Sequence, residues 1–203
     1  MDIRSTGKEK VMVRNAREEI LRVFAEELKT KPMEKIRVKD IISRTGISHN
    51  TFYYHFDDIF DLLHALLERE KERLAANIYS TDSWQDILRS LIRYARTYQT
   101  EIYHIYNSVP RERIERYFSA STESIMYHIV LIEAMDLHVD AEDIRCIADF
   151  YRCAIIGFFM QFLWSDMKMD VDEEIDRLAL IFRDNIHTVL QRCEERNNKK
   201  EHR

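Results

Sequence analysis

Glycine and proline are scarce in this chain of 203 residues, which contains 3 Gly and 2 Pro. Tight turns and hairpins depend heavily on these two residues, so their scarcity excludes a turn-rich sheet protein. Long stretches without a helix breaker favour helices instead, and we expect an all-helical (all-α) fold. The length allows a small N-terminal domain and a larger C-terminal one.

A long hydrophobic run is also lacking. The most apolar stretch, Cys153–Trp164, contains Gln161 and is about two-thirds of the roughly 18 residues needed to span a bilayer. The first residues do not form the apolar core of a signal peptide. We therefore expect a cytoplasmic protein without a membrane segment.

Cysteine is rare and has no metal-binding or redox spacing. Cys146, Cys153 and Cys193 are odd in number and form no Cys-x-x-Cys motif. This pattern predicts reduced, buried thiols, with redox sensing as the alternative.

Signatures of catalysis are missing as well. The eight histidines form no metal-spaced pair on one helical turn, and the chain contains neither a Gly-rich phosphate loop nor a nucleophile elbow. His104 and Glu101 are the one imaginable acid–base pair, and we interpret them as a solvated contact. We expect no enzyme activity, no metal site and no cofactor.

Charge is distributed unevenly along the chain. The total is 31 Lys and Arg against 36 Asp and Glu, which argues weakly against nucleic acid as a partner. Residues 1–56, however, carry 12 basic and 8 acidic side chains, a net charge of +4, whereas residues 57–203 carry 19 and 28, a net charge of −9. A basic head on an acidic body directs the head toward DNA.

The segment Arg37–Phe56 has the pattern of a helix-turn-helix. Apolar Val38, Ile41 and Ile42 form one stripe of a first helix, and a glycine follows as its stop signal. Ser48 then suits the N-cap of a second helix, whose residues are mostly hydrogen-bonding. Such a helix lies in the major groove of DNA, where polar side chains contact base edges and phosphates.

Read in order, these and neighbouring residues resemble the DNA-binding domain of the tetracycline-repressor (TetR) family of bacterial regulators. The matching positions are Ala16, Ile20, Phe24 and Leu28 of an amphipathic helix, the turn Pro32–Ile36, Asp40-Ile41, Gly46-Ile47-Ser48, Thr51-Phe52-Tyr53 and His55-Phe56, with a leucine-rich helix after them. The string Thr51–Phe56 further resembles the branch that contains dihydroxyacetone-kinase regulators.

Two positions depart from the family pattern. Arg37 stands where the family has a capping Thr, and Ile59 stands where the family has a phosphate-binding Lys. Asp57 and Asp58 precede Ile59; they suit the cap of a helix but repel phosphate. We expect this change to weaken DNA binding rather than abolish it.

The resemblance and the helical pattern together predict the domain organisation. We expect a flexible arm over residues 1–10, the helix-turn-helix domain over 11–56, a connecting helix over 57–79, a ligand-binding and dimerisation domain over 80–194, and a charged tail over 195–203. Helices are expected from Asp58 to about Tyr79, Trp84 to about Tyr106, Pro110 to about Met135, Asp140 to about Ser165 and Asp172 to about Glu194, with a loop at Ser80–Ser83.

Three sets of candidate site residues follow. For DNA contact they are Arg37, Lys39, Arg44, Ser48, His49, Asn50, Thr51, Tyr53, Tyr54 and His55, helped by Arg4, Lys8, Lys10, Arg14 and Arg17 of the N-terminal segment. For the homodimer interface, as two broad apolar helices and the resemblance imply, they are Tyr151, Ile155, Phe158, Phe159, Phe162, Leu178, Phe182, Ile186 and Val189. For a small-molecule effector, which the family implies, they are Tyr94, Tyr98, Tyr103, His104, Tyr127 and His128, aromatic groups with polar tips.

The sequence therefore predicts a homodimeric regulator, a repressor by preference, that binds a palindromic DNA site under the control of an unidentified small molecule. The alternative is a co-regulator that binds DNA weakly and acts through a partner protein.

Overall fold

The computed structural model describes residues 3–75, 84–182 and 185–201, and this part of the chain is helical without a strand. The chain divides into two compact units. The first comprises Met1–Asp82 and Arg93–Val109, and the second comprises Ser83–Ile92 and Pro110–Arg203. An all-α fold is confirmed. Residues 93–109, which we had expected in the C-terminal domain, belong to the first unit.

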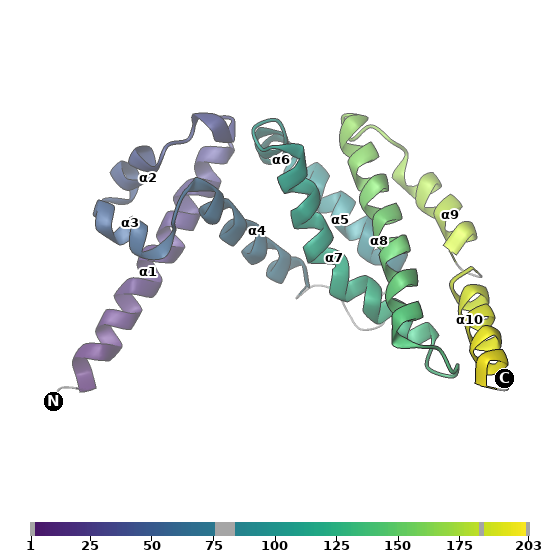
Figure 1. The fold of residues 1–203 in the computed structure, drawn as a ribbon. Helices are drawn as coiled ribbons and strands as arrows, with labels where there is room; N and C mark the ends of the chain where they lie inside the picture. Colours follow the sequence, from purple (N-terminus) through teal and green to yellow (C-terminus); the bar gives the residue numbers. More distant parts are fainter. Residues whose placement is uncertain (1–2, 76–83, 183–184, 202–203) are drawn as a thin grey trace. The chain divides into compact units, whose positions relative to one another are not determined.

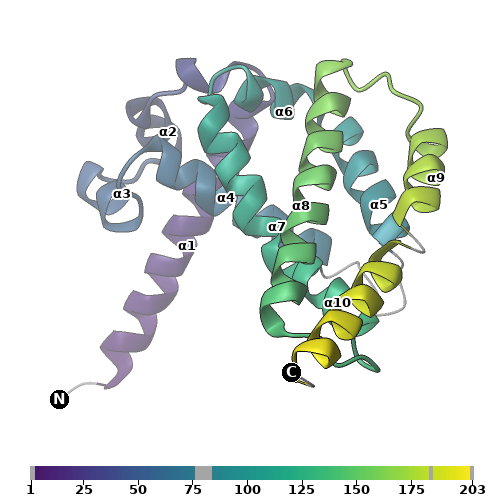
Figure 2. The ribbon, with the colours of Figure 1, turned by 45° about the vertical axis from the view of Figure 1, so that its right-hand side comes forward.

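The first unit is built around α1 (Ile3–Leu28), which packs against α2 (Val38–Thr45), α3 (His49–His55), α4 (Ile59–Ala75) and α6 (Gln99–Tyr106) (Figures 1 and 2). A short 3-10 helix, Met33–Lys35, makes the turn between α1 and α2. Ile20, Phe24 and Leu28 recur every four residues on α1 and are at most 1 % exposed. Their predicted role as the buried stripe of the first helix is confirmed.

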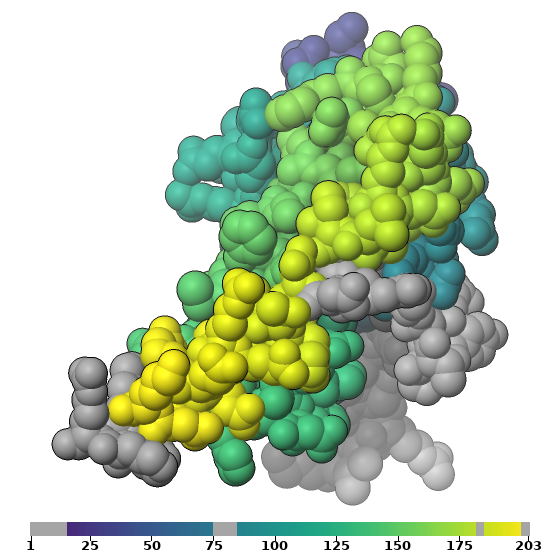
Figure 3. Space-filling view, turned by 90° about the vertical axis from the view of Figure 1, so that its right-hand side faces the viewer, coloured from purple at the N-terminus to yellow at the C-terminus, as the bar shows by residue number. Residues whose placement is uncertain are grey.

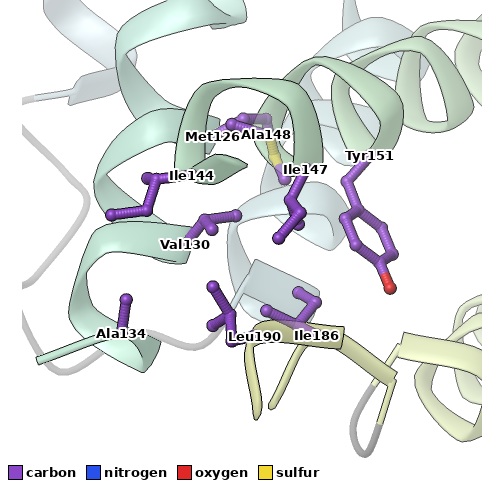
Figure 4. Close-up of a cluster of buried hydrophobic side chains, with 9 residues drawn as sticks. All are labelled: Met126, Val130, Ala134, Ile144, Ile147, Ala148, Tyr151, Ile186 and Leu190. Carbon is purple, nitrogen blue, oxygen red and sulfur yellow. The ribbon is translucent and has the colours of Figure 1, made fainter. Parts of the chain in front are cut away.

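The second unit contains α7 (Arg111–Glu133), α8 (Ala141–Trp164), α9 (Val171–Phe182), α10 (Asn185–Glu201) and the first part of α5 (Trp84–Thr97). Helices α7 and α8 pack against each other, and α10 covers both. Figure 4 shows the core that these three helices share; its residues are Met126, Val130, Ala134, Ile144, Ile147, Ala148, Tyr151, Ile186 and Leu190. Helices α9 and α10 form an outer layer beside α8 (Figure 3).

Two predicted helices are each divided in the structure. The helix expected from Trp84 to about Tyr106 bends at Tyr98, where φ is −108° and ψ is 33°, so that α5 and α6 are separate. The hydroxyl of Thr97 donates to the carbonyl of Arg93 at 2.9 Å, and such back-bonding bends helices. The helix expected from Asp172 to about Glu194 is α9 and α10, and the side chain of Asn185 competes for the carbonyl of Ile181 at the start of α10.

The expected arm and tail are helical where the structure describes them. Residues 3–10 continue α1, because extending a helix that has already formed adds one backbone hydrogen bond per residue. Helix α10 runs to Glu201, and an ion pair between Arg196 and Asp143 ties the predicted tail to α8. The loop Ser80–Ser83 and the last turn of the expected connecting helix lie outside the described residues.

Helix α8 is the described helix that bears on the expectation of no membrane segment. Among the described helices it alone is long and apolar enough, by length and composition, to cross a membrane, with a mean hydropathy of 1.4 in its best window. Eight of its side chains are buried, and the core helix of a globular unit passes the same test. We therefore assign its apolar character to the core of the second unit.

The prediction of buried thiols is wrong for two of the three cysteines. Cys146 and Cys153 are exposed, and Cys193 is half-buried; all three are free. Cys146 and Cys153 lie seven residues apart on one face of α8, beside the face that carries Ile147, so the helical period places both at the edge of the core.

Candidate nucleic-acid interface

Local capping builds the helix-turn-helix as the sequence predicts. Gly46 ends α2 in the left-handed region with φ of 69°, which a residue with a Cβ adopts at a cost. Ser48 caps α3, and its Oγ accepts a hydrogen bond from the backbone N–H of Thr51 at 3.0 Å. Phe52 and Phe56 are at most 2 % exposed and fix α3 on the core of the first unit.

The opposite face of α3 is polar and accessible. Ser48, His49 and Asn50 are exposed, Tyr53 is 47 % exposed and Tyr54 is 74 % exposed. The rings of His49 and Tyr53 lie 4.8 Å apart, so they form one surface of hydrogen-bonding aromatic groups. Thr51 is half-buried, and its hydroxyl lies 2.8 Å from the Ser48 hydroxyl. This helix therefore offers hydroxyl, amide and imidazole groups to a ligand with base edges and phosphates.

His55 differs from its neighbours on α3. Its ring is half-buried, and its Nε2 atom is buried without a hydrogen-bond partner among the described residues. Burial first, and the Arg17 cation second, lower the pKa of His55. The side chain is thus held as neutral imidazole against Phe56, at 6.2 Å between ring centroids. His55 therefore offers less of its ring to a ligand than its neighbours on α3 do, and its contact with DNA stays a prediction.

Arg44 is also engaged inside the first unit. Its guanidinium donates to the carboxylate of Glu26 at 2.8 Å and to that of Glu27, both on α1. Glu27 is 7 % exposed, and hydrogen bonds from Lys31 first and Arg44 second lower the pKa of its carboxyl group. Arg44 therefore joins α2 to α1, and its predicted phosphate contact stays a prediction.

Two cations at the start of α2 remain accessible. Arg37 and Lys39 are exposed, and neither forms an ion pair with another of the described residues. The backbone N–H of Arg37 donates to the carboxylate of Asp40 at 3.3 Å, which supplies half of a capping box although Arg37 itself is a poor cap. The two side chains are free to meet phosphate. The side chains of Arg4, Lys8, Lys10 and Arg14 lie outside the part that the structure describes.

The first turn of α4 carries acidic side chains at its free amides. The carboxylate of Asp58 accepts hydrogen bonds from the N–H groups of Phe60 at 2.7 Å and Asp61 at 2.8 Å, and the carboxylate of Asp61 accepts one from Asp57 at 3.1 Å. The prediction that Asp58 caps this helix is confirmed. A phosphate would compete with a bound carboxylate for the same helix N-terminus.

The candidate effector residues divide between the two units. Tyr94, Tyr98, Tyr103 and His104 belong to the first unit, whereas Tyr127 and His128 belong to the second. The Tyr94 hydroxyl donates to Glu70 at 3.4 Å, and burial, with a smaller effect of this carboxylate, raises the pKa of Tyr94.

Several of the remaining effector candidates have internal roles. His104 Nδ1 lies 2.6 Å from the carbonyl oxygen of Leu28, and Tyr127 packs against the shared core. Tyr98 is 39 % exposed and stacks at a tilt on Tyr94, 4.5 Å between ring centroids, whereas His128 is exposed. The six residues therefore do not form one site within either unit.

Half of the described residues predicted for the dimer interface are buried within the unit. Tyr151, Phe158, Phe162 and Ile186 are at most 9 % exposed, so they offer little surface to a partner chain, and their place in a dimer interface stays a prediction. Half-buried side chains make up the rest of the described set, namely Ile155, Phe159, Leu178 and Val189. The side chain of Phe182 lies outside the description.

Other apolar side chains of the same helices are exposed and lie outside the nine residues predicted for the interface. They are Phe150 at 70 % and Trp164 at 54 % on α8, and Leu180 at 84 % and Ile181 at 55 % on α9. Gly157 lies on the same face of α8 as Phe150, and nothing lies within 4 Å of where its Cβ would be. The signal was present in the helical period, since Phe150, Gly157 and Trp164 recur every seven residues.

The comparisons with known proteins cover both units. The family model described as "Bacterial regulatory proteins, tetR family" matches residues 20–66, and the model described as "Transcriptional regulator C-terminal region" matches residues 82–184, just over half of the chain. A solved structure titled "Dihydroxyacetone kinase operon activator DhaS" is similar to 88 % of this chain and 98 % of its own, with a TM-score of 0.62 and 18 % sequence identity. At this identity the likeness establishes the fold. No curated protein matches the sequence. The helix-turn-helix and both family matches show that the chain belongs to the TetR family of bacterial DNA-binding transcriptional regulators.

Proposed function

We propose that this protein is a homodimeric repressor that binds a palindromic DNA operator through α3 and releases it when a small molecule binds. The observation that carries the DNA-binding part is the geometry of α3. It is a capped helix with His49, Asn50, Tyr53 and Tyr54 on its accessible face, in a segment of net positive charge. A face of this composition suits the major groove.

Each side chain of this face has a proposed partner. The amide of Asn50 and the imidazole of His49 contact base edges, and the hydroxyls of Tyr53 and Tyr54 donate to phosphates. Arg37 and Lys39, both exposed, supply the cations for the phosphate backbone. Each cation that neutralises a phosphate steepens the salt dependence of binding by about one unit of slope.

The homodimer is proposed to form through the exposed faces of α8 and α9. Phe150, Trp164, Leu180 and Ile181 are large apolar side chains that are more than half exposed in the single chain. Gly157, in the middle of this face of α8, allows a second helix to approach closely. A two-fold dimer places two α3 helices on half-sites about one turn of DNA apart, roughly 34 to 36 Å.

Control by an effector requires a ligand that binds the DNA-competent and DNA-incompetent states with different affinities. Tyr98 is our first candidate for contact with this ligand, because it is an accessible aromatic group with a polar tip. We propose that the protein acts in the cytoplasm, where its operator is.

The second candidate function is a co-regulator that binds DNA weakly and acts through a partner protein. The specific observation that favours it is the N-terminus of α4. There the carboxylate of Asp58 occupies two amides, and Asp57 adds a second exposed negative charge. Both carboxylates repel phosphate.

Titration of the purified protein against DNA from upstream of its own gene, with scrambled DNA as control, separates the two functions. Fluorescence anisotropy at two salt concentrations should give saturable, salt-sensitive binding that prefers the upstream fragment. The variant Tyr53→Phe should bind more weakly at an unchanged melting temperature, since it loses only the hydroxyl. Equal, weak binding to both DNAs, with no site returned by a genome-wide selection, would favour the co-regulator.

The sign of regulation needs a separate measurement. The similar solved structure is titled an operon activator, whereas our proposal is a repressor. Transcription from the bound promoter in a reconstituted system should fall when the protein is added and recover with the effector. An increase on adding the protein would identify an activator instead.

A further inference from the structure

Two cysteines that are distant in the sequence are brought together by the packing of α8 and α10. The two helices run in opposite directions in the second unit (Figure 2), and near the end of α10 Arg196 forms an ion pair with Asp143 of α8. Cys146 follows Asp143 by three residues, and Cys193 precedes Arg196 by three. Residues three apart are neighbours on one face of a helix, so each thiol lies one turn from the ion pair.

The buried core also holds α8 and α10 together beside the two thiols. Ile147 on α8 and Leu190 on α10 belong to the same buried core, and Cys193 packs against that core. The ion pair on one side and the core on the other therefore set the register of the two helices. In this register Cys146 and Cys193 occupy facing turns.

The electrostatics of Cys193 agree with this placement. Burial first, and the Asp143 carboxylate second, raise the pKa of the Cys193 thiol, and Cys146 acts on it in the same direction while Arg196 opposes them. The contribution of Cys146 agrees with the placement that the ion pair and the core set. Cys146 itself is exposed to water and therefore to small oxidants.

We propose that Cys146 and Cys193 form a redox modification site, which a peroxide converts into a disulfide between α8 and α10. In the first step the Cys146 sulfur attacks the peroxide, the O–O bond breaks, and the thiol becomes a sulfenic acid with release of water or an alcohol. In the second step the Cys193 sulfur attacks the sulfenic sulfur, the S–S bond forms, and the hydroxyl leaves as water. Two thiols lose their hydrogens and one peroxide is reduced.

The roles of the two thiols follow from their surroundings. Cys146 meets the oxidant in the single chain, where it is exposed, whereas Cys193 is sheltered and resolves the sulfenic acid. Resolution needs the thiolate of Cys193, so raising the pH should accelerate the second step. The bond would tie α10 to α8 and should raise the melting temperature by several degrees, reversibly on reduction.

The experiment uses the full-length protein, treated with hydrogen peroxide and blocked with iodoacetamide. Intact mass and non-reducing peptide mapping then identify the linked residues. Wild type and the control variant Cys153→Ser should both lose two hydrogens and give a peptide joined through Cys146 and Cys193. The variants Cys146→Ser and Cys193→Ser should give no intramolecular link, and Cys146→Ser, at an exposed position, should keep the melting temperature of reduced wild type.

A sulfenic or sulfinic acid on Cys146 without a linked peptide would overturn the proposal, and so would a disulfide between two chains. A disulfide requires Cα atoms roughly 4.4 to 6.8 Å apart, so either result would mean that the helices do not reach this separation. The same map for protein oxidised in denaturant is the second control. If the native and denatured proteins give the same mixture of links, the fold does not select the pair.

Discussion

The cap of α4 combines a structural and an electrostatic effect that two substitutions of Asp58 separate. In Asp58→Ala the N–H groups of Phe60 and Asp61 lose an acceptor at 2.7 and 2.8 Å. Loss of an N-cap costs roughly 0.5 to 2 kcal/mol of stability, typically about 1 kcal/mol. For a chain of this size about 1 kcal/mol corresponds to a fall in melting temperature of roughly 2 to 4 °C.

Asp58→Asn keeps an oxygen that can accept the same hydrogen bonds and removes only the charge. The lost interaction with the helix dipole costs about 0.3 to 1 kcal/mol, so this variant should be more stable than Asp58→Ala. If a phosphate lies about 8 Å from the carboxylate, the removed repulsion in water is about 0.5 kcal/mol before screening by salt. This corresponds to roughly a twofold gain in affinity for each head, and about fourfold for a dimer with two heads.

Thermal unfolding followed by circular dichroism and operator binding followed by fluorescence anisotropy test this reasoning together. The expected order of stability is wild type, then Asp58→Asn, then Asp58→Ala, and the expected result for Asp58→Asn is tighter binding. Weaker binding by Asp58→Asn at low salt would show that the carboxylate assists the interaction with DNA, and our account of α4 would be wrong.

Three further predictions concern residues whose role the structure changes. Arg44→Met should lower the melting temperature and leave the salt slope of DNA binding unchanged, because Arg44 pairs with Glu27. Lys39→Met should reduce the salt slope by about one unit at an unchanged melting temperature, because Lys39 is exposed. A reduced salt slope in Arg44→Met at an unchanged melting temperature would identify Arg44 as a phosphate contact. Phe150→Glu should yield a folded monomer in size-exclusion chromatography with light scattering, because Phe150 is exposed. Tyr151→Glu, at a buried position, should unfold the second unit. A dimeric Phe150→Glu would exclude the exposed face of α8 as the interface. Because the pKa of His55 is lowered in the folded protein, the unfolded chain binds a proton at His55 more readily. The free energy of unfolding should therefore fall as the pH decreases through and below about 6.5, and His55→Gln should flatten this dependence. An unchanged pH profile in His55→Gln would contradict the burial of the imidazole.

Features with local causes were predictable from the sequence. Gly46, Ser48 and Asp58 were identified as helix stop or cap signals, and each has that role in the structure. A cap depends on a side chain and an amide two or three residues away, so no knowledge of the remaining fold was needed. The buried faces of α1 and α3 were predictable for the same reason, because one apolar stripe on a short amphipathic helix leaves one choice.

Features that depend on distant partners were not predictable. Arg44 was interpreted as a DNA contact because its partners, Glu26 and Glu27, lie on another helix. On α8 apolar residues occur on more than one face, so periodicity could not distinguish the core residue Tyr151 from the exposed Phe150. Tyr98 contains no helix-breaking signal, and the bend beside it became evident only with the backbone geometry.

The sequence by itself determined the helical class, the helix-turn-helix and its caps, because these depend on interactions within a few residues of the chain. Only the tertiary structure decided which apolar faces the core buries and which charged groups are already paired. The physical reason is that a side chain has one set of partners at a time. A residue is free to bind DNA, an effector or a second chain only if packing has not already engaged it, and packing is set by residues far away in the sequence.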